Sequence, residues 1–152
     1  MSRLTFTGAV AGALALSVMM AAPSAYAKTI KYQAKLEASQ ETPPNDSKGT
    51  GTADVTYNTG TQRLRWTVDY SGLTGPATGA HFHGPADPGQ SADVAVPLKG
   101  KLDSPIKGSA KLTKAQARDL EAGKYYLNIH TDAHPDGEIR GQVQEQKAGG
   151  SM

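Results

Sequence analysis

Apolar and polar residues alternate along several short stretches of the chain, which is the pattern of β-strands with one buried face. Residues 30–38 alternate without interruption, and the runs 53–57 and 64–70 flank a turn-forming sequence at residues 58–61. Side chains at every second position share one side of a strand, so each run predicts a half-buried strand. The short turn predicts that the last two runs form an antiparallel hairpin.

The second half of the chain continues this pattern and adds one helix. Shorter strands are expected in five places: 80–83, 94–96, 108–112, 125–129 and 138–144. After the third of these, Thr113 and Gln116 have the spacing of a capping box, and Gly123 is a stop signal. We therefore predict a short helix at about residues 113–122, packed over one end of a sheet.

Short strands separated by regular turn signals are typical of antiparallel β architectures. We expect an all-β domain, namely an antiparallel Greek-key sandwich or barrel with one short helix. Periodicity does not decide between a sandwich and a barrel. The apolar positions predict a core that contains these residues: Leu36, Leu64, Trp66, Val68, Phe82, Leu127 and Ile139.

Residues 1–27 have the composition of a secretory signal peptide. A single charge, Arg3, precedes a short apolar run, which ends in the small-x-small cleavage sequence of residues 25–27. Hydroxyl residues interrupt the run, which favours a cleaved signal over a membrane anchor. The sequence thus predicts a periplasmic or secreted domain at residues 28–146, a disordered tail at 147–152, and no membrane insertion after signal cleavage.

The formal net charge of +2 is small, and the chain has no cysteine. A balanced charge without a basic stripe gives no reason to expect nucleic acid as a partner. The lack of cysteine excludes disulfides, thiolate zinc sites, blue-copper sites and cysteine nucleophiles. The sequence also lacks a Gly-x-Ser-x-Gly elbow, a P-loop and a dinucleotide-binding fingerprint, so it assigns no catalytic residue.

All four histidines lie in two short segments at expected strand ends. His81 and His83 are two positions apart, so they share one face of a strand and can hold one ion, while Phe82 turns to the core. His130 lies on the polar side of its strand, and His134 lies in the turn beyond. If the strand ends meet, three or four imidazoles converge on a metal ion. The alternative is that the histidines are hydrogen-bonded and inert.

Neutral imidazole binds copper, zinc, iron and nickel. A site with three or four nitrogen ligands suits cupric copper in tetragonal geometry or zinc in tetrahedral geometry. For an exported protein we expect copper as the cofactor, with zinc as the alternative. Asp132 or Asp136 could complete a zinc or iron site.

Glu138, Arg140 and Gln142 share the polar face of the last expected strand. A general-acid role for Glu138 is one interpretation of this row. The favoured interpretation is an ion-pair and hydrogen-bond network that locks the strand against a neighbour, since charged rows on strands are usually structural or solvated.

Three segments together resemble the CHRD (chordin-type) domain family, which also includes single-domain secreted proteins of bacteria. They are residues 34–44 (AKLEASQETPP), 80–86 (AHFHGPA) and 126–142, which begin with YLNIHT and end with GEIRGQ. The resemblance covers nearly all of the predicted domain and implies a β-sandwich of immunoglobulin-like size. It implies no established activity, and the role of chordin as an extracellular antagonist of bone morphogenetic proteins is not transferred to this short chain.

A second, partial resemblance concerns the copper-zinc superoxide dismutases. Residues 72–75 (GLTG), followed by His81 and His83, are similar to the loop and His-x-His strand of that family. The resemblance implies that these two histidines are copper ligands, with His130 or His134 supplying others. The dismutase disulfide and zinc-binding loop are absent and its superoxide-guiding arginine cannot be placed, so the likeness supports metal binding more than dismutation.

Three functions are consistent with these observations. The first is a metal carrier or buffer that binds copper through the four histidines. The second is an extracellular interaction module whose partner is another exported protein or a polymer, and whose histidines are structural. The third is a copper-dependent redox enzyme. The sequence favours the first, in which the protein is not an enzyme.

Overall fold

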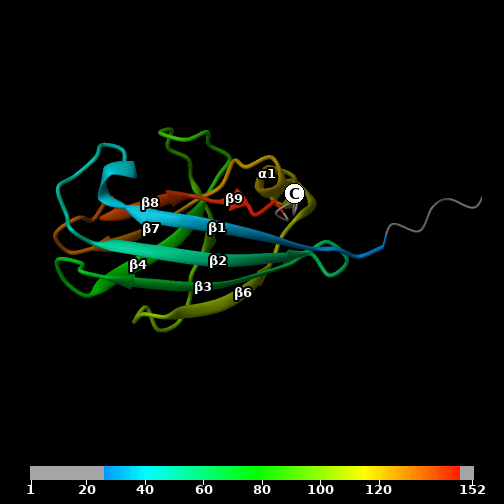
Figure 1. Cartoon of the computed structure of the whole chain (residues 1–152), viewed down its shortest axis with the longest axis horizontal. Helices are drawn as coiled ribbons and strands as arrows, with labels where there is room; N and C mark the ends of the chain where they lie inside the picture. Colours follow the sequence, from blue (N-terminus) through cyan, green and yellow to red (C-terminus); the bar gives the residue numbers. More distant parts are fainter. Residues whose placement is uncertain (1–25, 148–152) are drawn as a thin grey trace, which may run out of the picture.

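The computed structural model describes residues 26–147, in which nine antiparallel strands form one sheet that curls into a nearly closed barrel (Figure 1). The strands are β1 (Thr29–Glu37), β2 (Thr50–Asn58), β3 (Arg63–Ser71), β4 (Ala77–His83), β5 (Val94–Pro97), β6 (Ile106–Lys111), β7 (Tyr126–Thr131), β8 (Ile139–Gln142) and β9 (Gln144–Glu145). Their order along the sheet is β5-β4-β7-β8-β1-β2-β3-β6, with β9 also paired to β1. The all-β prediction is confirmed, and the sheet is closer to a barrel than to a sandwich.

The core lies inside the barrel and contains the residues that the alternation predicts. All seven predicted core residues are buried, and Trp66 is the most exposed of them at 5%. The ring of Trp66 in β3 meets the ring of Phe82 in β4 edge to face, with 5.5 Å between centroids. Such aromatic pairs add to the free energy of burial and fix the packing of the two strands across the core.

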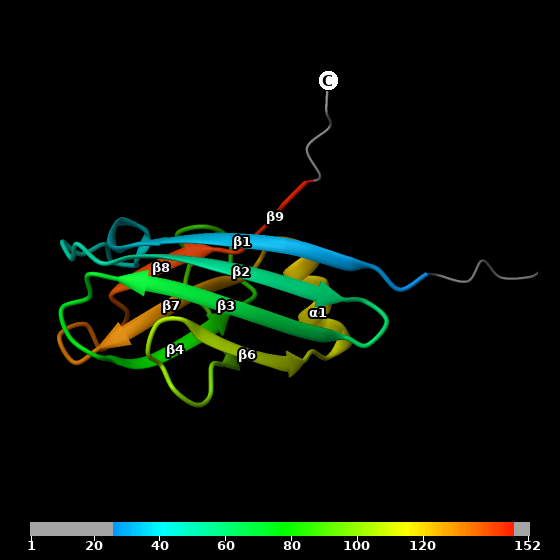
Figure 2. The same ribbon diagram turned by 60° about the horizontal axis from the view of Figure 1, so that its bottom comes forward.

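The helix α1 (Lys114–Glu121) begins and ends where the sequence predicts. Thr113 Oγ1 accepts a hydrogen bond from the Gln116 backbone N–H, and Gln116 Oε1 accepts one from the Thr113 N–H, which completes the capping box. Gly123 has a φ of 73°, a left-handed conformation that suits the residue after a helix. Leu120 is fully buried, so the helix closes one end of the barrel (Figure 2).

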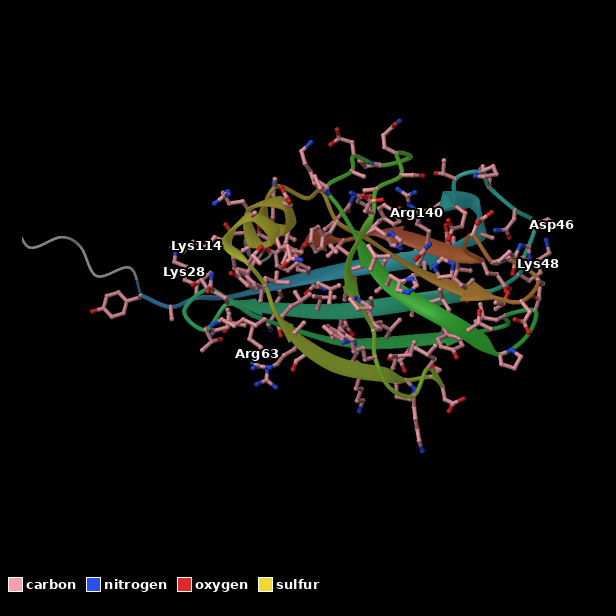
Figure 3. All side chains as sticks on the ribbon, turned by 180° about the vertical axis from the view of Figure 1, so that it is seen from behind. Lys28, Asp46, Lys48, Arg63, Lys114 and Arg140 are labelled. Carbon is pink, nitrogen blue, oxygen red and sulfur yellow. The ribbon has the colours of Figure 1, made fainter. Side chains whose placement is uncertain are left out.

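The outer face of the sheet departs from simple alternation near β7. Tyr126 and Asn128 point to the polar side of this strand, yet they are 4% and 3% exposed. The segment after β4 covers them, because the Ala92 N–H donates to the Tyr126 hydroxyl and the Gln90 carbonyl accepts from Arg140. Figure 3 shows the labelled Arg140 beside this segment. Alternation of apolar and polar residues predicts one buried and one exposed face for β7, but in the structure both faces of this strand are buried.

Several expected boundaries differ from the structure, among them the start of β6, which is at Ile106 rather than at residue 108. β4 starts at Ala77 rather than at residue 80, and the strand expected at 138–144 is divided at Val143 into β8 and β9. The predicted signal peptide and tail lie, apart from residues 26, 27 and 147, outside the described residues. Within residues 26–147, no helix has both the length and the apolar character needed to span a bilayer.

Candidate metal centre

The register of β4 and β7 brings the two histidine segments together. His81 lies opposite Asn128, and His83 lies opposite Tyr126. Directly opposed residues in an antiparallel pair project from the same face. Since His130 is two residues from Asn128, it joins them on this outer face.

Three imidazoles converge there. One ring nitrogen from each of His81, His83 and His130 lies within 4.8 Å of the corresponding nitrogens of the other two. The ring centroids of His81 and His130 are 4.9 Å apart, and those of His81 and His83 are 5.6 Å apart. His83 is 9% exposed and the other two rings are partly exposed, so the cluster opens to solvent on one side.

Two of the rings are oriented by backbone carbonyls. His83 Nδ1 donates to the Ala92 carbonyl oxygen at 3.0 Å, and His130 Nδ1 donates to the Pro135 carbonyl oxygen at 2.8 Å. A neutral imidazole carries one N–H, so both Nε2 atoms are left with lone pairs. This outer contact to Nδ1 is the arrangement that orients a histidine for ligation through Nε2.

Both Nε2 atoms face the side chain of Asn128. Its Oδ1 lies 2.9 Å from His83 Nε2 and 3.0 Å from His130 Nε2, and His81 Nδ1 is 3.1 Å from His130 Nε2. His81 can place its one N–H on Nδ1 and donate to His130 Nε2, but no proton then lies between the two acceptors His83 Nε2 and Asn128 Oδ1. Either a cation bridges these acceptors, or the Asn128 amide turns so that its Nδ2 donates to the imidazoles.

Burial favours the neutral form of these histidines. It is the main reason that the pKa of His83 falls below its ordinary value, in spite of hydrogen bonds that favour the charged form. Burial also lowers the pKa of His81, with further lowering by His130 and His83. Neutral rings at neutral pH keep the lone pairs that a metal ion needs.

A second layer of side chains holds His83 in place. Its ring stacks on Tyr126 with parallel planes and 4.8 Å between centroids. The Arg140 Cζ atom lies 3.5 Å from the Tyr126 centroid, a cation–π contact. The Tyr126 hydroxyl also donates to the Ala92 carbonyl, the same group that orients His83. The aromatic ring and the loop therefore restrict the rotation of this imidazole together.

The family assignment follows from a comparison with known families. The model of the family described as the CHRD domain matches residues 32–143. The chain belongs to the CHRD domain family. No curated protein and no solved structure gave a significant match to the chain. In this CHRD domain the histidine cluster lies wholly inside the matched region.

The structure does not bring every predicted ligand to the cluster. His134 is not a member of the three-histidine group, and neither are Asp132 and Asp136. The His134 backbone instead closes a turn with Thr131, with its N–H 3.1 Å from the Thr131 carbonyl oxygen. The expected set of four histidines is thus reduced to His81, His83 and His130.

Sequence reasoning did not assign two residues that belong to this site. Asn128 shares the polar face of its strand with His130, and that i, i+2 spacing was a usable signal. Glu41 carries no such signal, because it lies in a loop far away in the sequence. Glu41 as a whole is 6% exposed, and burial raises the pKa of its carboxyl to about 7, against the lowering effects of the Thr42 N–H, Arg140 and Asn128.

Glu138 is a structural residue of this CHRD domain. Its carboxylate is fully buried and accepts four hydrogen bonds, from Ser47 Oγ, Thr74 N, Thr74 Oγ1 and Thr131 Oγ1. The predicted network is present, but it holds hydrogen bonds and no ion pair. The only ion pairs among residues 26–147 are Lys35–Glu37 and Lys124–Asp87.

Proposed function

We propose that this CHRD domain is an exported protein that binds a cupric ion and acts as a copper carrier or buffer. The ligands in this proposal are His81, His83 and His130, with Asn128 Oδ1 as a fourth donor. The observation that carries it is the convergence of acceptor atoms without enough protons, since two Nδ1 atoms are committed to backbone carbonyls. A cation at this point would accept the lone pairs of the two Nε2 atoms and of Asn128 Oδ1.

Two features favour copper over zinc. Sites made of nitrogen and oxygen ligands generally bind Cu²⁺ more tightly than Zn²⁺, and we expect the same order for three imidazoles. The partly exposed rings of His81 and His130 also leave one side of the ion open to solvent. An open side suits exchange of the ion with another carrier, whereas structural zinc sites are closed.

Calorimetric titration of tag-free protein with Cu²⁺ and Zn²⁺ tests the proposal. We expect one Cu²⁺ per chain with a Kd well below about 0.1 mM and a weaker affinity for Zn²⁺. At a free ion concentration one hundred times the Kd, binding should stabilise the fold by about 2.7 kcal/mol. Because ligation needs neutral imidazole, affinity should fall as the pH is lowered below about 6.5.

Single substitutions separate the ligands from the rest of the chain. His83→Ala and His130→Ala should each weaken Cu²⁺ binding by about 100-fold or more. His134→Ala is the matched control and should leave the affinity unchanged, because His134 lies outside the cluster. A wild-type Kd above about 0.1 mM for both ions would refute metal binding, as would equal binding by the His83 variant and the parent.

A further inference from the structure

The barrel is open between its two end strands. A groove of about 460 Å³ runs between β5 and β6. Figure 2 shows β6 at the margin of the sheet, with β4 behind it. The groove is lined from β5 by Ala95, Val96 and Pro97, and from β6 by the four residues 108–111. Within residues 26–147, neither strand has a partner on this side.

The two edges of the groove differ in their capacity to pair with another strand. On β5, Pro97 has no N–H to donate, and Gln116 Nε2 of helix α1 already donates to the Ala95 carbonyl at 2.9 Å. On β6, no side chain of the described residues forms a hydrogen bond with the backbone N–H and C=O groups that face away from β3. The free template for strand addition is therefore β6.

A buried polar atom also faces this groove. Trp66 lines it and is 5% exposed, and its Nε1–H has no hydrogen-bond partner within residues 26–147. The indole lies against Gly108 of β6, where a Cβ atom would be only 2.6 Å from the ring. Glycine at this position therefore lets the indole N–H reach the edge strand.

The positive charge around the groove favours a negatively charged binding partner. Lys99 and Lys111 line it, and none of its ten lining residues is acidic. Lys107, next to the groove on β6, and Arg63, whose Nη1 donates to Ser109 Oγ, add two further positive charges. A segment with glutamate or aspartate side chains would be attracted to this edge, whereas a second copy of the same edge would be repelled.

From these observations we propose that the β5–β6 groove binds an extended acidic segment of another exported polypeptide, which adds as a strand to β6. The backbone of the segment pairs with β6 alongside Trp66. Its acidic side chains contact the lysines at the rim. This recognition by strand addition is independent of the histidine cluster, so the protein can bind an ion and a partner separately.

The single tryptophan of the chain makes the groove directly observable. The probe is a blocked peptide of about eight residues that alternates glutamate and valine, and the matched control peptide alternates lysine and valine. We expect a saturable change in Trp66 fluorescence with the glutamate peptide only, with a Kd of about 10–100 µM and weaker binding at high salt. The absence of a saturable change up to about 1 mM would overturn the proposal.

Variants test the contacts. The double substitution Lys99→Glu and Lys111→Glu should lower the affinity for the glutamate peptide by at least about tenfold. The control double substitution Lys31→Glu and Lys48→Glu lies away from the groove and should leave this affinity unchanged. His83→Ala should bind the peptide as the parent does. Urea midpoints verify that each variant is folded, and a folded groove variant with unchanged affinity would refute the proposal.

Discussion

Glu138→Gln is the most informative test of how the loops around the site are held. The carboxylate is fully buried, with Oε1 accepting from Ser47 Oγ and the Thr74 N–H, and Oε2 accepting from the hydroxyls of Thr74 and Thr131. Glutamine keeps the shape and can present its oxygen to the first pair. Its NH₂ group then faces two hydroxyls, which can rotate to accept, so no donor is left unpaired.

The expected cost follows from the loss of charge. Hydrogen bonds to a charged group contribute about 1.5–3 kcal/mol each, and neutral ones contribute about 0.5–1.5 kcal/mol. Four bonds would therefore lose roughly 4 kcal/mol, and the lower cost of burying an amide instead of a carboxylate offsets part of it. We expect Glu138→Gln to lower the free energy of unfolding by about 2–3 kcal/mol at pH 7.

The dependence on pH identifies the mechanism. Burial alone would raise the pKa of Glu138, but hydrogen bonds from Ser47, Thr131 and Thr74 outweigh it and hold the pKa below its ordinary value. A carboxyl with a depressed folded-state pKa stabilises the protein above the unfolded-state value of about 4.3, and the stabilisation is lost as the pH falls through the folded-state value. The gap between the parent and the variant should therefore narrow below about pH 4.

Urea unfolding at several values of pH between 7 and 3 measures this gap. Glu145→Gln serves as the control, because Glu145 is exposed at the end of the sheet and should have little effect. A Glu138 variant as stable as the parent at pH 7 would show that the hydrogen bonds contribute nothing net. A gap that stays constant down to pH 3 would show that the carboxylate charge is not the source of the stabilisation.

Two further substitutions test the core and the helix. Leu127→Ala should lower the free energy of unfolding by about 3 kcal/mol or more in urea titrations, since Leu127 is fully buried between β4 and β8. An unchanged midpoint would contradict its place in the core. Thr113→Ala removes the side-chain half of the capping box and should cost about 1 kcal/mol, whereas a loss below about 0.2 kcal/mol would mean that the cap is not used in solution.

The strands and the helix could be predicted because each has a local signal. Alternation identified β1, β2, β3 and β7, and the capping box fixed α1 within a residue. The closure of the sheet could not be predicted, because it depends on which distant strands pair. β8 lies between β7 and β1, and no pattern within β8 encodes a partner more than one hundred residues earlier in the chain.

The candidate site was only partly predictable for the same reason. The i, i+2 spacing of His81 and His83 is local, and their meeting with His130 needed only that β4 and β7 be neighbours. His134 was expected because it is close to His130 in sequence. The turn that contains it is closed by backbone hydrogen bonds with Thr131, and these leave it outside the cluster.

The hydrogen-bond partners of the proposed ligands lie in loops, so the proposed metal affinity would depend on the stability of those loops. The strands direct His83 and His130 to one face, but the Ala92 and Pro135 carbonyls decide which ring nitrogen is free for an ion. Both carbonyls lie outside the strands, one in the segment between β4 and β5 and the other in the turn between β7 and β8. Arg140 fastens the first segment by donating to the Gln90 carbonyl. A change that frees this segment should therefore weaken ion binding without touching a ligand, because an imidazole that has lost its carbonyl partner can adopt the other tautomer.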